Sequence, residues 1–177
     1  AGKSRESLVP LQRAVRTMID QGRYAPAIRA ADLCMAAADL TSPKNPLPKI
    51  PRLEARRLKA RALLESEQYG PAAELLQATL ASERTDRLYE ARLKGLLGAA
   101  RLSVGEMEEA RDLLDSAHES FRALRDTNGR AQVAFWLAQL SRQLNNLDAA
   151  ADYFRESMGL TEKESRLGVQ VIAGLAT

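Results

Sequence analysis

The sequence predicts an all-α protein, an α-solenoid of about four antiparallel helix hairpins followed by a terminal helix. Alanine, leucine, arginine and glutamate, all good helix formers, dominate the 177 residues, whereas strand-forming residues never alternate over a useful length. One short pattern also returns four times: a turn position, a large apolar or aromatic residue two positions on, and an alanine three positions beyond that. Self-similarity at a period near 40 residues is the signature of a helical repeat array.

The four copies of this pattern divide the chain into pairs of helices. They are Gly22/Tyr24/Ala27, Glu67/Tyr69/Ala72, Gly105/Met107/Ala110 and Asn145/Leu147/Ala150, and their turn positions lie 45, 38 and 40 residues apart. The predicted repeats cover residues 6–40, 52–83, 86–124 and 128–159, and the terminal helix covers residues 162–175. Together they form one predicted helical repeat domain over residues 1–177, whose two ends look cut from a longer protein.

The first repeat is predicted from an apolar face on residues 6–21. Its apolar residues recur at spacings of three and four, and the face stops at Gly22; they are Leu8, Leu11, Val15, Met18 and Ile19. A second helix is expected over residues 24–39. Because short turns join helices of this length as antiparallel neighbours, residues 6–39 are predicted to form the first hairpin.

A proline-rich segment, residues 41–51, interrupts the array after the first repeat. Its four prolines predict an extended loop instead of a helix; they are Pro43, Pro46, Pro48 and Pro51. The segment is also basic. Two interpretations stay open, a loop that bridges an irregular step and a docking ligand for another protein.

Six further helices are predicted after this loop, at residues 52–66, 70–83, 86–103, 106–124, 128–144 and 147–159. The first of them departs from the register of the other copies, because Arg56 and Lys59 stand where that register needs apolar residues. A shift of one residue would turn Ala55, Leu58 and Ala62 inward. The helix is predicted in either case, and the shifted register is the better interpretation of its apolar residues.

The residues around each repeated alanine resemble the tetratricopeptide repeat. A larger residue follows the alanine at +4 and a small one at +7, as in Ala110/Leu114/Ala117 and Ala150/Phe154/Ser157. Small residues at a helix crossing allow close approach, and a large residue opposite fills the space between layers. The period near 40 resembles the longer-helix subgroup of this family, found in signalling adaptors, motor light chains and bacterial regulators. The resemblance implies a right-handed superhelix that binds a partner protein or peptide.

Composition bounds the other function classes. The formal charge of +3 arises from 26 basic and 23 acidic residues without a basic tract, which gives little support to nucleic-acid binding. No apolar stretch approaches the roughly 20 residues of a membrane span. A single cysteine, Cys34, lies in an apolar helical run, which favours a core thiol in a reducing compartment. The chain is therefore predicted to be cytoplasmic and to have no membrane partner.

The sequence shows no constellation that would support catalysis. His118 is the only histidine, so neither a histidine-based metal cluster nor a Ser/His/Asp set can be assembled, and we expect it at the surface or in the groove. The acidic runs near residues 106–109 and 162–164 fall in first turns of helices, where negative charge complements the macrodipole. We therefore expect no enzyme activity, no catalytic residue, no metal and no cofactor.

The resemblance implies a concave groove lined by the first helix of each pair. In the family, the exposed positions of this groove lie six and ten residues before the turn, and two further arginines lie one turn to either side here. These positions are Gln12, Arg16, Arg57, Arg61, Arg92, Gly95, Ala99, Phe135, Gln139 and Arg142. Arginine forks suit the carboxylates or carbonyl groups of an acidic peptide. The alternative is that these arginines are ordinary solvated positions.

Phe135 and Trp136 are adjacent, so on a helix they point about 100° apart and cannot both lie in one core. One interpretation packs one ring against Leu140 and Phe154 and leaves the other to a ligand. The other interpretation buries both rings partly between neighbouring helices.

Three hypotheses for function follow. The first is a scaffold that binds a partner protein or peptide in the concave groove, whose arginines favour an acidic one. The second is a regulatory sensor segment of a larger cytosolic signalling or transcription-regulating protein. The third is self-association through the apolar residues 166–176.

Overall fold

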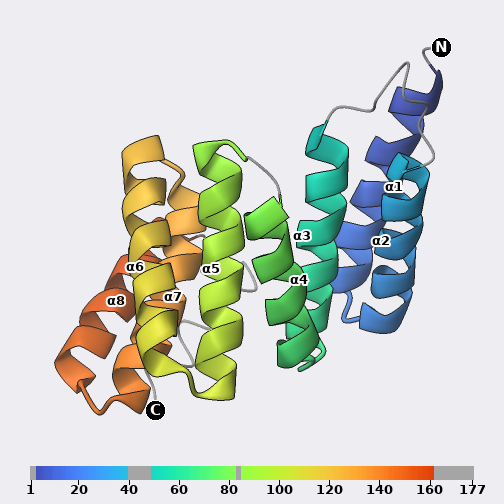
Figure 1. Cartoon of the computed structure of the whole chain (residues 1–177). Helices are drawn as coiled ribbons and strands as arrows, with labels where there is room; N and C mark the ends of the chain where they lie inside the picture. Colours follow the sequence, from blue (N-terminus) through green and yellow to red (C-terminus); the bar gives the residue numbers. More distant parts are fainter. Residues whose placement is uncertain (1–2, 40–48, 83–84, 162–177) are drawn as a thin grey trace. The chain divides into compact units, whose positions relative to one another are not determined.

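The computed structural model describes residues 3–39, 49–82 and 85–161, which form eight α-helices and no strand (Figure 1). They belong to two compact units. The first unit contains α1 (Lys3–Asp20), α2 (Tyr24–Asp39), α3 (Lys49–Glu65) and α4 (Tyr69–Ser82); the second contains α5 (Arg87–Val104), α6 (Met107–Leu124), α7 (Thr127–Gln143) and α8 (Leu147–Leu160). The predicted all-α class is confirmed.

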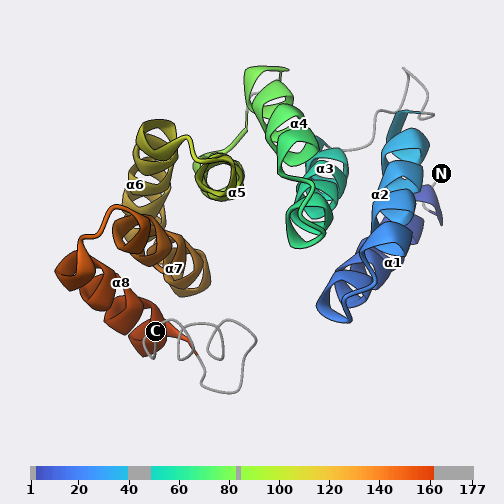
Figure 2. The same cartoon turned by 90° about the horizontal axis from the view of Figure 1, so that it is seen from below.

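Within each unit, helices that are consecutive in sequence pack as hairpins. In the first unit α1 packs on α2, α2 on α3 and α3 on α4, and α1 also touches α3. In the second unit α5 packs on α6, α6 on α7 and α7 on α8, and α5 touches α7. Figure 2 shows α7 lying between α6 and α8. The first helices of neighbouring pairs therefore meet each other, α1 with α3 and α5 with α7.

The four predicted turn positions share one backbone conformation. Gly22, Glu67, Gly105 and Asn145 have φ angles of 73°, 61°, 88° and 58°, in the left-handed region that ends many helices. At Gly105 the backbone N–H donates to the carbonyl of Leu102, which satisfies an end of α5. The recurring turn position is thus a recurring helix C-terminus.

The repeated alanines lie in the core. Ala27, Ala72, Ala110 and Ala150 are all buried, each one turn into the second helix of its pair. The shifted register predicted for α3 is confirmed as well, since Ala55, Leu58 and Ala62 are buried and belong to the core of the first unit. That core joins them to Val15 and Ile19 of α1 and to Ala31 and Cys34 of α2.

In the second unit, glycines allow large residues to approach the first helices. A Cβ atom on Gly98 of α5 would lie 2.7 Å from Cγ of Leu114, and one on Gly129 of α7 would lie 2.4 Å from the Phe121 ring. Both distances are shorter than those that Cβ atoms keep from other heavy atoms in protein structures, so only glycine fits at these two helix crossings.

The structure corrects two predictions. The proline-rich loop does not extend to residue 51, because α3 begins at Lys49 and includes Pro51. Proline is tolerated there, since an N–H in the first turn of a helix has no intrahelical acceptor to lose. Gly95 and Ala99 are buried, not exposed; Val133 and Trp136 of α7 lie against Gly95.

Other predicted segments lie outside the described residues: most of the proline-rich loop, the terminal helix 162–175 and the apolar residues 166–176. Among the described helices, none has the length and apolarity that crossing a bilayer requires.

Candidate partner-binding surfaces

Charge is divided between the two helices of each pair. The four first helices together contain sixteen lysines and arginines against five aspartates and glutamates. The four second helices contain four basic residues against eleven acidic ones. The small net charge of the chain therefore conceals two classes of helix with opposite charge, which favour partners of opposite sign.

In the first unit, the predicted arginines surround a buried carboxylate. Glu54 of α3 is 8% exposed and accepts hydrogen bonds from Nη2 of Arg16 at 2.9 Å and from Nε and Nη2 of Arg57 at 2.9 and 2.8 Å. Arg16 comes from α1, so this carboxylate joins α1 to α3. The Arg16 side chain remains 56% exposed, whereas that of Arg57 is 15% exposed. Arg57 therefore positions Glu54, and Arg16 faces solvent.

A second ion pair joins the same two helices. Nη2 of Arg61 on α3 lies 3.0 Å from Oδ1 of Asp20 on α1. The Arg61 side chain is mostly covered, so its guanidinium also fastens the hairpins together. Gln12 lies on α1, where its side chain is partly buried.

In the second unit, Arg92 of α5 pairs with the residue that starts α7. Its Nη2 lies 3.4 Å from Oδ2 of Asp126, whose other oxygen accepts the Gly129 N–H at 2.9 Å as a helix cap. The guanidinium also lies 5.9 Å from the centre of the Tyr89 ring, within the range of a cation–π contact. Arg92 is thus held between a carboxylate and an aromatic face.

The remaining predicted positions lie on α7. Nη2 of Arg142 donates to Oε1 of Gln139 at 2.7 Å, and the Arg142 side chain is exposed. The partly buried Phe135 meets the Phe154 ring of α8 edge to face, with centroids 6.0 Å apart. Trp136 is partly buried too and packs on the core formed by α5, α6 and α7. Both rings therefore lie partly between helices, as the second interpretation expected.

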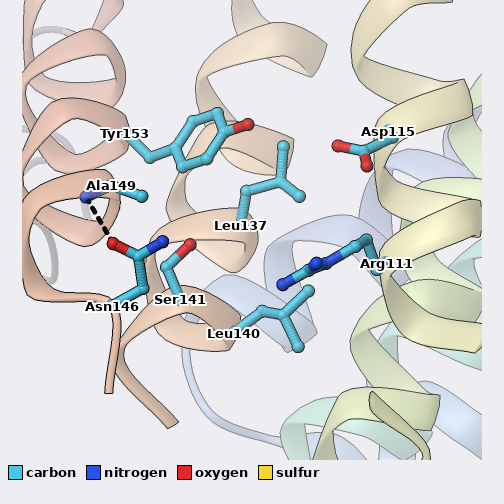
Figure 3. Close-up of a pocket in the computed structure, with 8 residues that line it drawn as sticks. All are labelled: Arg111, Asp115, Leu137, Leu140, Ser141, Asn146, Ala149 and Tyr153. Carbon is cyan, nitrogen blue, oxygen red and sulfur yellow. Dashed lines mark hydrogen bonds between the residues drawn. The ribbon is translucent and has the colours of Figure 1, made fainter. Parts of the chain in front are cut away.

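A polar cavity between α6 and α8 was not predicted from the sequence. It has a volume of about 220 Å³ and its floor is α7; Figure 3 shows the eight residues that line it, Arg111, Asp115, Leu137, Leu140, Ser141, Asn146, Ala149 and Tyr153. The Asn146 side chain caps α8 by accepting the Ala149 N–H at 3.2 Å. The Tyr153 hydroxyl points across the cavity toward the Asp115 carboxylate (Figure 3).

Burial and neighbouring charge alter the acidity of the groups in this cavity. Desolvation raises the pKa of Asp115 above its usual value of 3.8, although nearby Arg111 partly opposes that rise. Desolvation and the negative charge of Asp115 also raise the pKa of Tyr153. Both shifts indicate that the cavity is incompletely solvated and disfavours negative charge.

His118 belongs to a separate ionic cluster beside the cavity. Its Nε2 lies 3.0 Å from Oε1 of Glu156 on α8, and Arg130 of α7 also pairs with that oxygen. His118 is partly buried, and its ring meets that of Tyr153 on α8 edge to face, so α8 partly covers it. Cys34 is a buried free thiol whose pKa is raised by burial, as a core thiol should be. Within the described ranges, no group of three or more His, Cys, Asp or Glu side chains is placed to bind a metal ion.

These features define a class, the helical repeat proteins built of antiparallel helix pairs. Residues 89–163 match the model of the tetratricopeptide repeat family. This match confirms the resemblance seen in the sequence over this part of the chain.

Solved structures have the same fold. The chain is similar to residues 41 to the end of MamA from Desulfovibrio magneticus RS-1, with 20% identity and a TM-score of 0.60 over 86% of this chain and 75% of that one. It is also similar to PcrH, crystallised in complex with the chaperone binding region of PopB, with 25% identity and a TM-score of 0.54 over 73% of this chain and 98% of that one. No curated protein matched the chain.

Proposed function

We propose that the chain is a protein-interaction scaffold, without catalytic activity of its own, that binds an acidic partner segment on the first helices of its repeats. One observation supports this most directly. Arg16 and Arg92 each present a guanidinium that is held by a carboxylate from the next helix pair, Glu54 and Asp126. Because a guanidinium has five N–H donors, one ion pair leaves donors for a partner, and its fixed position lowers the entropy lost on binding.

The charge of these helices and one structural relative support the same proposal. Sixteen basic residues against five acidic ones favour an acidic ligand on the first helices. PcrH, at 25% identity, was solved with a bound segment of another protein, which favours a peptide-like partner here. In this proposal Arg57 and Arg61 act as positioning residues, and Arg16, Arg92 and Arg142 contact the partner. Gln12, Phe135 and Gln139 supply neighbouring polar and apolar contacts.

A pair of matched variants tests the proposal. One replaces Arg16, Arg92 and Arg142 of the first helices with glutamine. The other replaces Arg29, Arg122 and Arg155, three exposed arginines of the second helices, with glutamine. Each variant removes three positive charges, so a difference between them reports the position of the charge and not its amount.

The measurement is the Kd of peptides selected on the parent chain from a random display library, determined by fluorescence anisotropy. We expect the selected peptides to be rich in aspartate and glutamate. The Kd of these peptides should rise about tenfold or more for the first-helix variant and less than about threefold for the second-helix variant. Equal losses in both variants, or selected peptides without an acidic excess, would contradict the proposal.

A further inference from the structure

The cavity between α6 and α8 lies on the second helices of its unit and is not used by the proposed function. Its position is well suited to a side chain from outside. α6 and α8 both pack on α7, and they touch each other through His118, which contacts Tyr153 and Glu156. The space beside these contacts has α7 as its floor. The floor is apolar, with Leu137 and Leu140, and the rim is polar (Figure 3).

Ser141 contributes a hydroxyl to this cavity. The residue is 7% exposed and lies in the last turn of α7. The hydroxyls of Ser82, Ser103 and Ser120 donate to the backbone carbonyl four residues earlier in their helices. The Ser141 hydroxyl makes no hydrogen bond to any residue that the structure describes, although the Ser141 carbonyl accepts the Asn146 N–H at 2.8 Å. This hydroxyl can therefore donate and accept hydrogen bonds, and it points into a space that a ligand can enter (Figure 3).

Two further oxygen groups of the cavity are also available. In the described part of the chain, neither the Tyr153 hydroxyl nor the Asp115 carboxylate has a hydrogen bond or ion pair. They come from α8 and α6, and Ser141 comes from α7, so each of the three helices contributes one acceptor. The three acceptors surround an apolar floor within about 220 Å³.

Among the charged side chains, that of lysine fits this arrangement of oxygen atoms best. An ammonium group has three N–H donors and no acceptor, so one carboxylate and two hydroxyls can satisfy it completely. The methylene stem of a lysine would lie on Leu137 and Leu140, since such stems pack on apolar surface while the charged end stays hydrogen-bonded. The wider, planar guanidinium of arginine suits a bidentate carboxylate instead of three separate oxygens.

The approach to the cavity has the charge that such a ligand needs. A neighbouring hollow of about 420 Å³ shares Arg111 and Asn146 with the cavity and is also lined by Glu108 and Asp112. The two linings together contain three carboxylates and one guanidinium. Arg111 stands where the hollows join, so it can donate to a backbone carbonyl of the incoming chain. The second helices as a whole contain eleven acidic residues against four basic ones.

We propose that this cavity binds a lysine side chain of a partner protein segment, with its ammonium group held by Asp115, Tyr153 and Ser141. The site is distinct from the arginines of the first helices. A partner with a basic segment could therefore bind the second helices of this unit while an acidic segment binds the first helices.

The test uses a blocked pentapeptide with one central lysine, titrated into the isotope-labelled chain and followed by amide chemical shifts at physiological salt. We expect saturable shifts that centre on residues 111–115, 137–141 and 146–153. The same peptide with an Nε-acetylated lysine, which keeps the stem and loses the charge, should give no saturable shift. An arginine peptide should bind about fivefold or more weakly than the lysine peptide.

Variants separate the cavity from the acidic surface around it. Asp115→Asn and Ser141→Ala change the side-chain volume little, and each should weaken the binding of the lysine peptide about tenfold. Glu119→Gln removes a charge from the same helix as Asp115, outside the cavity, and should weaken the binding of this peptide less than twofold. The first-helix triple variant should bind the lysine peptide as the parent does, which keeps this test independent of the first.

Three results would overturn the proposal. They are the absence of saturable shifts, equal binding of the acetylated peptide, and an equal loss for Glu119→Gln and Asp115→Asn. The last result would mean that lysine is attracted by a diffuse acidic surface and not by this cavity.

Discussion

Ion pairs join helices in both units, but the second unit adds close packing against glycines. In the first unit, ion pairs link α3 to α1 and α2: Glu54 with Arg16, Arg61 with Asp20, and Lys59 with Asp32 at 2.7 Å. In the second unit, Arg92 pairs with Asp126 and His118 with Glu156, and glycines add close packing, with Leu114 against Gly98 and Phe121 against Gly129. The family match covers residues 89–163, which lie in the second unit. The family model therefore matches the unit in which large side chains lie against glycines.

The chain contains a natural reporter for each unit. Its single cysteine, Cys34, is buried in the core of the first unit, so a thiol reagent labels it only when that core opens. Its single tryptophan, Trp136, packs on the core of the second unit, so its fluorescence follows that unit. The comparison between the units can therefore be tested without added probes.

The largest effect is expected from Phe121→Ala in the second unit. Phe121 is buried against Gly129, and its truncation leaves a cavity at a helix crossing. We expect a loss of about 3–5 kcal/mol in the free energy of unfolding, measured by urea denaturation with Trp136 fluorescence. The rate of Cys34 labelling should change much less. An equal acceleration of labelling would show that the two units unfold as one, and the comparison would then fail.

The corresponding change in the first unit is Glu54→Gln. This substitution keeps the shape of the side chain and removes the negative charge that pairs with the guanidinium of Arg57. The Arg57 side chain is only 15% exposed. We expect a loss of about 2 kcal/mol, less than for a fully buried pair because Arg16 remains in water. Cys34 labelling in increasing urea measures the loss, which should be absent from Trp136 fluorescence.

Asp152→Asn provides the control for this change. It removes the carboxylate of an exposed pair, Asp152 with Arg155, where both side chains are more than half exposed. Its effect should stay below about 0.5 kcal/mol. A loss for Glu54→Gln as small as that of the control would show that the ion pairs of the first unit do not join its helices.

The sequence predicted those features that each repeat expresses locally. The turn positions and the repeated alanines were found because one residue at one spacing determines each of them. The side chains that bind or brace were harder to predict. Arg57 and Arg61 occupy the expected positions on α3, but their burial depends on Asp20 and Glu54, carboxylates whose pairing cannot be inferred from spacing alone.

The cavity could not be predicted for a related reason. Asp115, Ser141 and Tyr153 belong to three helices, and only the packing of α6 and α8 on α7 brings them together. The one local signal was the pair Arg111 and Asp115, four residues apart on a helix, a spacing at which opposite charges commonly attract each other. The structure shows no ion pair between these two described residues, which leaves Asp115 to other partners.

A smaller effect, of opposite sign, is expected at Glu67 of the first unit. This residue lies two positions after the end of α3 and has a φ of 61°, where a residue with a Cβ atom is strained and glycine is not. Glu67→Gly should raise the free energy of unfolding by about 0.5–1 kcal/mol as seen by Cys34 labelling. Gly105→Ala in the second unit, at a φ of 88°, should lower it by a similar amount, as measured by Trp136 fluorescence. If both substitutions were neutral, the shared turn conformation would not contribute to stability in either unit.

The smallest effect concerns the pH dependence of the second unit. Because desolvation raises the pKa of Asp115, the folded state binds this proton more tightly than the unfolded state does. The stability contributed by Asp115 is therefore present below its usual pKa of 3.8 and is lost as pH rises through the raised folded value. Asp115→Asn should be more stable than the parent at neutral pH by a few tenths of a kcal/mol, roughly, since water screens this exposed carboxylate. The difference should disappear below that usual value.

Urea denaturation followed by Trp136 fluorescence at several pH values measures this difference, with Glu119→Gln as the matched change on the same helix. The saturating lysine peptide provides a second check. An ammonium beside Asp115 favours the charged carboxylate, so with the peptide bound the parent should become the more stable protein at neutral pH. If the peptide stabilised Asp115→Asn as much as the parent, the carboxylate would not be part of the lysine site.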